Sequence, residues 1–397
     1  MKICLLTCLA PFLVDEKVFP PLGLMAVGTA LRAQGHDVMI ASLPDDSKYF
    51  AIGPTTPEYP NALAMLHQIK QRDKNSRVVI GGPHATANAM DCIIDGFDVV
   101  ALGDGENITA ETFEVNGVTD LGRRQLDGYP ITDRGLVDIH SYHYKIDGRL
   151  ATTLVTSRGC PYRCGFCSNT ERQVRYYSVD RINAEIIYLR DWWGYKALMI
   201  FDDVFIFNKE RALRICAVLK RHEIVWRCFV RGDIVVRHGL DLIDVMSSSG
   251  CVEVGIGIES GSDEILKTIN KGEDTRTIQE AILLLHHGGI RVKGFFIVGL
   301  PGENRYTLER TRRFLGQVPL DDVDFTVYQP FRGSPIWENR RDYDINWDND
   351  VGSSGRTEQR FYKGRQGEYE SIVSTSALTQ ADILKERDDL ERLFKSS

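Results

Sequence analysis

The feature that most constrains the fold of this chain is a regular alternation of short apolar runs with helix-like stretches. Five apolar runs alternate in this way from residue 1 to about residue 112, and a second series begins at residue 151 and repeats six times. Neighbouring parallel strands need a long crossover connection, usually a helix, whereas antiparallel strands do not. The alternation therefore predicts an α/β protein with two parallel sheets.

The two series predict four regions along the chain. Residues 1–112 are expected to form a doubly wound, Rossmann-like domain. Residues 113–150 have weaker periodicity and are interpreted as a linker. Residues 151–336 predict a partial (β/α)6 barrel, with its chemistry at the C-terminal ends of the strands. The tail, 337–397, is polar at first and ends in an amphipathic segment for which Thr379 is the expected N-cap.

Composition and charge exclude several classes of function. The formal net charge of −7 argues against a broad basic face, so no nucleic-acid partner is expected. No apolar run approaches the ~20 residues of a membrane span. The N-terminal run resembles a signal peptide, but a helix-like pattern follows at once, which favours a first buried strand. The nine scattered cysteines favour reduced thiols over a disulfide framework, and hence a cytoplasmic protein.

The stretch RGCPYRCGFCSNT holds Cys160, Cys164 and Cys167 at a CxxxCxxC spacing, just after the first expected barrel strand. Thiolates bind zinc or iron–sulfur clusters. A structural zinc site would need a second Cys or His pair, and the next histidine downstream is the distant His222. Three unrelated core cysteines are disfavoured by the Gly, Arg, Pro and Asn residues around them. The spacing predicts a 4Fe-4S cluster with one iron left open to another ligand.

This loop, with Phe166 before the last cysteine, resembles that of the radical S-adenosylmethionine (SAM) enzymes. The resemblance implies that SAM binds the open iron and is cleaved reductively to methionine and a 5′-deoxyadenosyl radical. It also implies SAM contacts at successive strand ends: Asp202 and Asp203 for the ammonium group, Arg231 for the carboxylate, Glu259 and Ser260 for the ribose, and Gly299 beside the adenine.

Two of these residues have simpler alternatives. Asp203 could instead cap a helix, and Arg231 could form a surface ion pair. The family usually carries a Gly-Gly-Glu-like stretch where this chain has Asp202 and Asp203. This departure leaves open which of the two carboxylates binds SAM.

The expected loops of the first domain carry small residues that let a large ligand approach the backbone, although turn formation alone would also explain them. Placed ahead of such a barrel, they resemble the cobalamin-binding domain of cobalamin-dependent radical SAM enzymes. The resemblance implies these cofactor contacts: Pro21, Leu22, Thr55, Thr56, Gly81, Gly82, Pro83, His84, Gly103, Gly105 and Glu106.

The Asp-x-His-x-x-Gly motif that supplies a cobalt ligand in some cobalamin proteins does not occur in this sequence. Radical SAM members generally lack it, which implies that the cobalt is bound without histidine. His84 is expected to be a loop residue near the edge of the cofactor.

The resemblance implies a methyltransferase that acts on an unactivated carbon of a small-molecule or natural-product substrate, with a flavodoxin or ferredoxin as electron donor. Two alternatives remain open. One is a radical SAM enzyme that rearranges or cyclises its substrate, with or without cobalamin. The other is a non-catalytic electron-transfer or metal-binding protein. Candidate substrate contacts are Tyr328, Gln329 and Arg332, while His140 and His143 could line a domain interface or face water.

Overall fold

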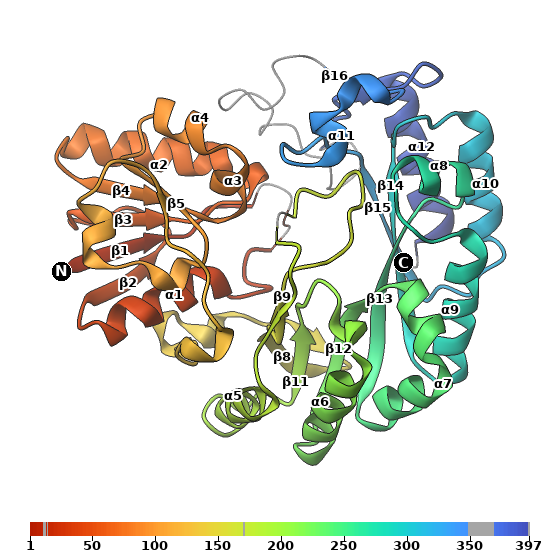
Figure 1. Ribbon diagram of the computed structural model, residues 1–397, viewed down its shortest axis with the longest axis horizontal. Coiled ribbons are helices and arrows are strands. Elements are labelled where there is room, and N and C mark those ends of the chain that lie inside the picture. Colours follow the sequence, from red (N-terminus) through yellow and green to blue (C-terminus); the bar gives the residue numbers. More distant parts are fainter. Residues whose placement is uncertain (11–12, 14, 170, 348–368, 396–397) are drawn as a thin grey trace. The chain divides into compact units, whose positions relative to one another are not determined.

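The structure is a computed structural model of the chain. It describes residues 1–10, 13, 15–169, 171–347 and 369–395. The chain divides into two compact units. The first contains Met1–His143, and the second begins at Tyr144 and includes the C-terminal helix. Figure 1 shows both units, which we describe separately.

The first unit is built on a six-stranded sheet in which every neighbouring pair is parallel, in the order β2-β1-β3-β4-β5-β6. The order reverses at β1 and β3, so the doubly wound, Rossmann-like prediction is confirmed. Such sheets bind ligands beyond the carboxyl ends of their strands, near the reversal. The strands are β1 (Lys2–Leu6), β2 (Asp37–Ala41), β3 (Tyr49–Ile52), β4 (Arg77–Ile80), β5 (Val99–Leu102) and β6 (Gly117–Asp120).

Helices cover both faces of this sheet (Figure 1): α1 (Leu22–Ala33) on one face, and α2 (Tyr59–Arg72), α3 (Gly82–Ala87) and α4 (Ala89–Ile94) on the other. Successive residues of β1 point to opposite faces. Cys4 and Leu6 pack in the core beneath α2. Leu5 points to α1, because a Cβ added at Gly28 would lie 3.1 Å from its Cδ1. Both faces are therefore buried, which explains the continuous apolar runs in the sequence.

The linker predicted at 113–150 is wrong at both ends. β6 pairs with β5 and completes the first sheet, and β7 (Lys145–Ile146) pairs antiparallel with the first barrel strand. The residues of β6 alternate between half-buried and exposed at the sheet edge. Because few of its side chains are buried, this edge strand has no apolar run from which the sequence could predict it.

The second unit contains a seven-stranded sheet in the order β15-β14-β13-β12-β11-β8-β7. Its six longer strands are all parallel, and β15 and β8 are not neighbours in this order. The sheet is therefore an open, partial barrel, as predicted. These strands are β8 (Arg149–Leu154), β11 (Ala197–Ile200), β12 (Val225–Val230), β13 (Cys251–Glu259), β14 (Arg291–Val298) and β15 (Asp322–Val327).

The barrel helices include α5 (Val179–Asp191), α6 (Lys209–Arg221), α9 (Thr275–His287) and α10 (Arg305–Leu315), in keeping with the predicted (β/α)6 alternation. The unit also contains α7 (Gly232–Ser248) and the short α8 (Asp263–Thr268). α7 is interrupted at Gly239, whose φ of 65° is not helical. This break shifts the apolar pattern partway along the helix, so no single helical period runs through the whole segment.

The tail contributes α11 (Pro335–Glu338), an antiparallel pair formed by β16 (Asn346–Trp347) and β17 (Val373–Ser374), and α12 (Gln380–Phe394). The Thr379 side chain accepts a hydrogen bond from the backbone N–H of Asp382, so the predicted N-cap is confirmed. Residues 348–368 of the predicted polar part of the tail lie outside the described residues. Among the helices that the structure describes, none is both long and apolar enough to cross a membrane.

Candidate functional site

The cysteine loop follows β8 at the carboxyl edge of the parallel strands, where the barrel prediction placed it. A short antiparallel pair, β9 (Ser157–Arg158) and β10 (Arg175–Tyr176), closes its base. The backbone N–H of Cys160 donates to the carbonyl of Glu171 (2.9 Å), which ties the start of the loop to its return. The three cysteines are therefore presented from one closed loop.

Two glycines make this loop possible. Gly159 has a φ of 95°, and a Cβ there would lie 2.5 Å from the carbonyl oxygen of Gln173. The N–H of Gly165 donates to the carbonyl of Ile269 (2.6 Å), and its own carbonyl accepts from the N–H of Ile336 (2.9 Å). Backbone contacts to α8 and α11 therefore shape the loop independently of what the thiols bind.

The thiols fit a metal cluster chemically. Cys164 is buried, and Cys160 and Cys167 are half-buried. Burial raises the pKa of the Cys160 and Cys167 thiols, and the neighbouring cysteines raise it further. Bound iron would displace the protons and compensate the negative charge that the loop otherwise disfavours. No group of three His, Cys, Asp or Glu side chains suited to one metal ion occurs among the described residues, and all nine cysteines are free thiols.

The two predicted aspartates have different surroundings. Asp202 is buried and accepts from the N–H groups of Thr156 (2.6 Å) and Ser157 (3.0 Å) and from both of their hydroxyls. Asp203 is exposed, and its carboxylate accepts from the Asn169 amide (3.0 Å). Of the two carboxylates, Asp203 is the accessible one. The helix-cap alternative for Asp203 is wrong, because Asn208 caps α6.

Arg231 follows β12 and is only 7% exposed, so the surface ion pair considered for it is wrong. Its Nε lies 3.0 Å from an Asp233 carboxylate oxygen, and its Nη2 lies 3.1 Å from Glu273 Oε2. Its guanidinium stacks on the Tyr162 ring at 3.6 Å from the centroid. Nη1 donates to Cys164 Sγ at 3.7 Å. A ligand carboxylate at Arg231 would have to compete with these partners.

A buried ion pair lies beside Arg231 and was not predicted. Lys271 Nζ is 2.8 Å from Glu259 Oε1, and both residues are buried. Burial lowers the pKa of Lys271, but Glu259 and Glu273 raise it more, so the net pKa is raised and the lysine stays charged. Lys271 and Glu273 fall in the polar stretch NKGED, which by sequence is typical of a solvated surface.

Glu259 has a φ of 67° where the pairing of β13 with β14 shifts register. Such a left-handed residue at a bulge re-aims a side chain and is frequent at functional sites. A Cβ at Gly257 would lie 2.5 Å from Glu259 Oε1, so any other residue there would require the Glu259 carboxylate to shift.

Ser260 and Gly299 have structural partners. Ser260 is fully buried, and its Oγ is 3.3 Å from the Thr311 hydroxyl of α10. Gly299 has a φ of 90°, and a Cβ there would lie 3.0 Å from Ile383 of α12. Its N–H donates to Glu303 Oε2 (2.7 Å), a buried carboxylate that was not predicted. Phe166 is half-buried in the cysteine loop.

The predicted cofactor contacts of the first unit follow β1, β3, β4 and β5, so parallel pairing gathers them at one edge of the sheet. The loops are shorter than expected, because several of these residues lie in helical turns. Pro21 is the N-cap of α1, which begins at Leu22, and Thr55 caps the 3-10 turn that starts at Thr56. Gly105 and Glu106 belong to another such turn.

At this edge, Thr55, Gly82, Pro83 and Gly103 are exposed, and Gly81 is half-buried. An exposed edge of small residues fits a large planar ligand that approaches the backbone. His84 does not belong to it: the prediction of a loop residue is wrong, since His84 is buried in α3 and stacks on Tyr59 with ring centroids 3.8 Å apart.

The remaining candidates, which are the proposed substrate contacts and two histidines, have separate surroundings. Tyr328 is buried, Gln329 is half-buried, and the Arg332 guanidinium lies 5.7 Å from the Trp337 ring centroid. His140 is exposed, and His143 Nε2 lies 2.5 Å from Asp15.

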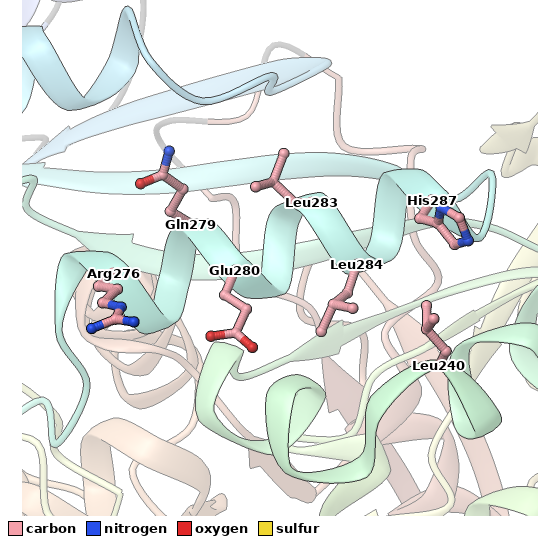
Figure 2. Close-up of a pocket in the computed structure, with 7 residues that line it drawn as sticks. All are labelled: Leu240, Arg276, Gln279, Glu280, Leu283, Leu284 and His287. Atoms are coloured by element: carbon pink, nitrogen blue, oxygen red, sulfur yellow. The ribbon is translucent and has the colours of Figure 1, made fainter.

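A pocket between α7 and α9, shown in Figure 2, contains none of the predicted site residues. It is lined by Leu240, Arg276, Gln279, Glu280, Leu283, Leu284 and His287.

Comparison with known proteins agrees with this arrangement. Residues 154–315 match the family model described as the radical SAM superfamily. The fold and the cysteine loop thus define a radical SAM protein. Residues 12–112 match the B12 binding domain. The chain therefore combines a radical SAM domain with a B12-binding domain, the pair of domains that characterises the cobalamin-dependent radical SAM enzymes, whose cofactors are a 4Fe-4S cluster, SAM and cobalamin.

Three similar proteins illustrate the range of this family. An uncharacterized methyltransferase of Pyrococcus horikoshii is 29% identical over 80% of this chain and 78% of its own. The anaerobic magnesium-protoporphyrin IX monomethyl ester cyclase of Cereibacter sphaeroides is 25% identical over 68% of this chain but only 49% of its own. The radical SAM methyltransferase TsrM from Kitasatospora setae, solved with cobalamin and a [4Fe-4S] cluster, has a TM-score of 0.70 at 14% identity. Its match covers 100% of this chain and 93% of TsrM, and at that identity it supports the fold alone.

Proposed function

We propose that this protein is a methyltransferase that uses SAM, a 4Fe-4S cluster and cobalamin to methylate an unactivated carbon of a small molecule. The observation that carries the proposal is the closed CxxxCxxC loop at the carboxyl edge of the barrel strands, in a chain that also has a B12-binding domain. Similarity to the Pyrococcus horikoshii protein named as a methyltransferase favours methyl transfer over other radical chemistry.

The chain's own residues take distinct roles in this proposal. Cys160, Cys164 and Cys167 hold the cluster, and Asp203, as the accessible aspartate, accepts the SAM ammonium group. When bound, the cluster supplies an electron for SAM cleavage and cobalamin carries a methyl group. Glu259 is proposed to contact the ribose.

The remaining predicted SAM residues divide by burial and partners. Asp202, Ser260 and Gly299 are assigned to positioning the strand ends, because their polar groups already have protein partners. Phe166 and Arg231 are proposed to shape the SAM pocket from the cysteine loop and from the end of β12.

The test is anaerobic reconstitution with iron, sulfide and hydroxocobalamin, followed by SAM and a strong reductant. We expect 5′-deoxyadenosine and S-adenosylhomocysteine in the same sample by mass spectrometry. Cys164→Ala should abolish 5′-deoxyadenosine, while Cys216→Ala, a buried cysteine outside the loop, should retain it. A wild-type protein with a full cluster and neither product would contradict the proposal.

A second candidate is a radical cyclisation or rearrangement without methyl transfer. It is favoured by the similarity to the cyclase of Cereibacter sphaeroides, although this chain spans only about half of that protein. SAM labelled in its methyl group separates the two candidates. Label in the organic product supports the methyltransferase, and an unlabelled product of altered mass supports the second candidate.

We further propose that a flavodoxin or ferredoxin in the cytoplasm delivers the electron. Nine free thiols are consistent with a reducing compartment. Replacing the chemical reductant by a reduced flavodoxin or a reduced ferredoxin should sustain 5′-deoxyadenosine formation with at least one of them.

A further inference from the structure

Arg231 links the cysteine loop to a group of buried carboxylates. On one side its Nη1 donates to Cys164 Sγ at 3.7 Å, and its guanidinium stacks on Tyr162 of the same loop. On the other side it pairs with Asp233 and with Glu273, whose side chain is fully buried. A single cation therefore contacts both the predicted cluster ligand and two anions.

Several contacts fix the position of the Arg231 guanidinium. Nη2 also donates to the carbonyl of Lys271 (2.8 Å), and the Tyr162 hydroxyl donates to Asp233 (3.1 Å), so the arginine and its stacking partner share an anchor. The Asp233 N–H donates to Glu273 Oε1 (2.8 Å). A planar fork held at Nε and Nη2 keeps its charge at a fixed distance from Cys164.

The positive charge of Arg231 is also poorly screened by water. Arg231 is 7% exposed, and an interaction between charges is far stronger in such a setting than in water. An added electron makes a thiolate-bound cluster more negative, and a nearby fixed cation stabilises that reduced form. Glu273 opposes this effect because it compensates part of the arginine's charge.

We propose that Arg231 is a positioning residue that orients Cys164 and raises the reduction potential of the cluster, with Glu273 as its opposing partner. The proposal rests on the proposed function, because it needs the loop to bind a cluster. It assigns to Arg231 a role beyond the SAM contact that the family resemblance implied.

The test is a redox titration of the reconstituted full-length protein without SAM, followed by electron paramagnetic resonance. In Arg231→Gln, the ratio of reduced to oxidised cluster at a fixed potential should fall about tenfold, equivalent to about 59 mV for a one-electron couple. In Glu273→Gln the ratio should rise. Arg231→Lys retains the charge and should lie closer to wild type than Arg231→Gln. Arg313→Gln, an exposed arginine on α10, is the matched control and should leave the ratio unchanged.

The opposite signs separate an electrostatic role from a merely structural one. Shifts of Arg231→Gln and Glu273→Gln in the same direction, or an Arg231→Gln ratio equal to that of Arg313→Gln, would overturn the proposal. If Arg231→Gln fails to assemble a cluster, Glu273→Gln decides: a higher ratio supports the role, and an unchanged ratio overturns it. Absence of a cluster in the wild type would instead defeat the proposed function itself.

Discussion

At the scale of the residue, several buried charged groups of the second unit lie at or near strand ends. Glu303 is one of them: it is 1% exposed and accepts from the N–H of Gly299 (2.7 Å). Burial raises its pKa to about 8, while hydrogen bonds from Gly299 and Leu300 lower it only in part. In the unfolded chain a Glu titrates near pH ~4.3.

This pKa shift predicts a pH-dependent stability. Between pH ~4.3 and about 8 the folded protein binds a proton at Glu303 that the unfolded chain does not, so stability falls as the pH rises through this window. Glu303→Gln should flatten the fall in Tm of the apoprotein between pH 5 and pH 8, measured by calorimetry. Glu309→Gln, an exposed glutamate on α10, is the control. Equal slopes for wild type and Glu303→Gln would refute the assignment.

A second residue-scale prediction concerns Gly257. A Cβ there would lie 2.5 Å from Glu259 Oε1 and 3.1 Å from Lys271 Nζ, so alanine requires the buried ion pair to shift from its present position. Gly257→Ala should lower the free energy of unfolding by roughly 1–3 kcal/mol. Gly316→Ala, where the nearest atom would be 3.6 Å away, should change it little. Chemical denaturation of the apoprotein measures both, and a neutral Gly257→Ala would mean that the pair can move aside.

At the scale of the element, the carboxyl ends of the strands are joined by side chains as well as by the sheet. Asp202 follows β11 and binds the Thr156 and Ser157 backbone beyond β8, at the base of the cysteine loop. Asp203, the next residue, is exposed and accepts a hydrogen bond from the Asn169 amide. The two adjacent aspartates therefore have different roles. Asp202 joins two strand ends, and Asp203 is available to a ligand.

This difference predicts opposite phenotypes for two isosteric substitutions. Asp202→Asn loses acceptors for a buried cluster of donors and should cost about 1–3 kcal/mol of stability. Asp203→Asn should leave stability unchanged but weaken SAM binding to the reconstituted protein, measured by equilibrium dialysis. Weaker SAM binding in a fully stable Asp202→Asn protein would reverse the two assignments.

At the scale of the whole molecule, each of the two large sheets has a carboxyl edge at which we propose a cofactor site, one in the radical SAM domain and one in the B12-binding domain. Both sheets are open, and their edges gather residues that lie far apart in the sequence. The two units should therefore respond separately to their own ligands.

We expect hydroxocobalamin to raise the Tm of one calorimetric transition of the apoprotein and to leave the other in place. At 100 times its Kd, a ligand that binds only the folded state contributes about 2.7 kcal/mol. Thr55→Ala serves as a test of the proposed edge and should reduce the shift, while Ser168→Ala, in the cysteine loop, should not. A Tm shift in neither transition would argue that the first unit does not bind cobalamin.

The sequence alone was sufficient for the two sheets, all six parallel barrel strands, the Thr379 cap and the cysteine loop, because periodicity, capping and ligand spacing are local properties of the chain. Tertiary structure decided the rest. β6 has no apolar run, so the sequence pattern could not predict it. Asp202 and Asp203 could be distinguished only by their burial in the structure. Arg231 and the Lys271 carbonyl are 40 residues apart in sequence, yet they meet beside Cys164. No local pattern encodes such a contact, since it depends on how neighbouring strands end at a common edge.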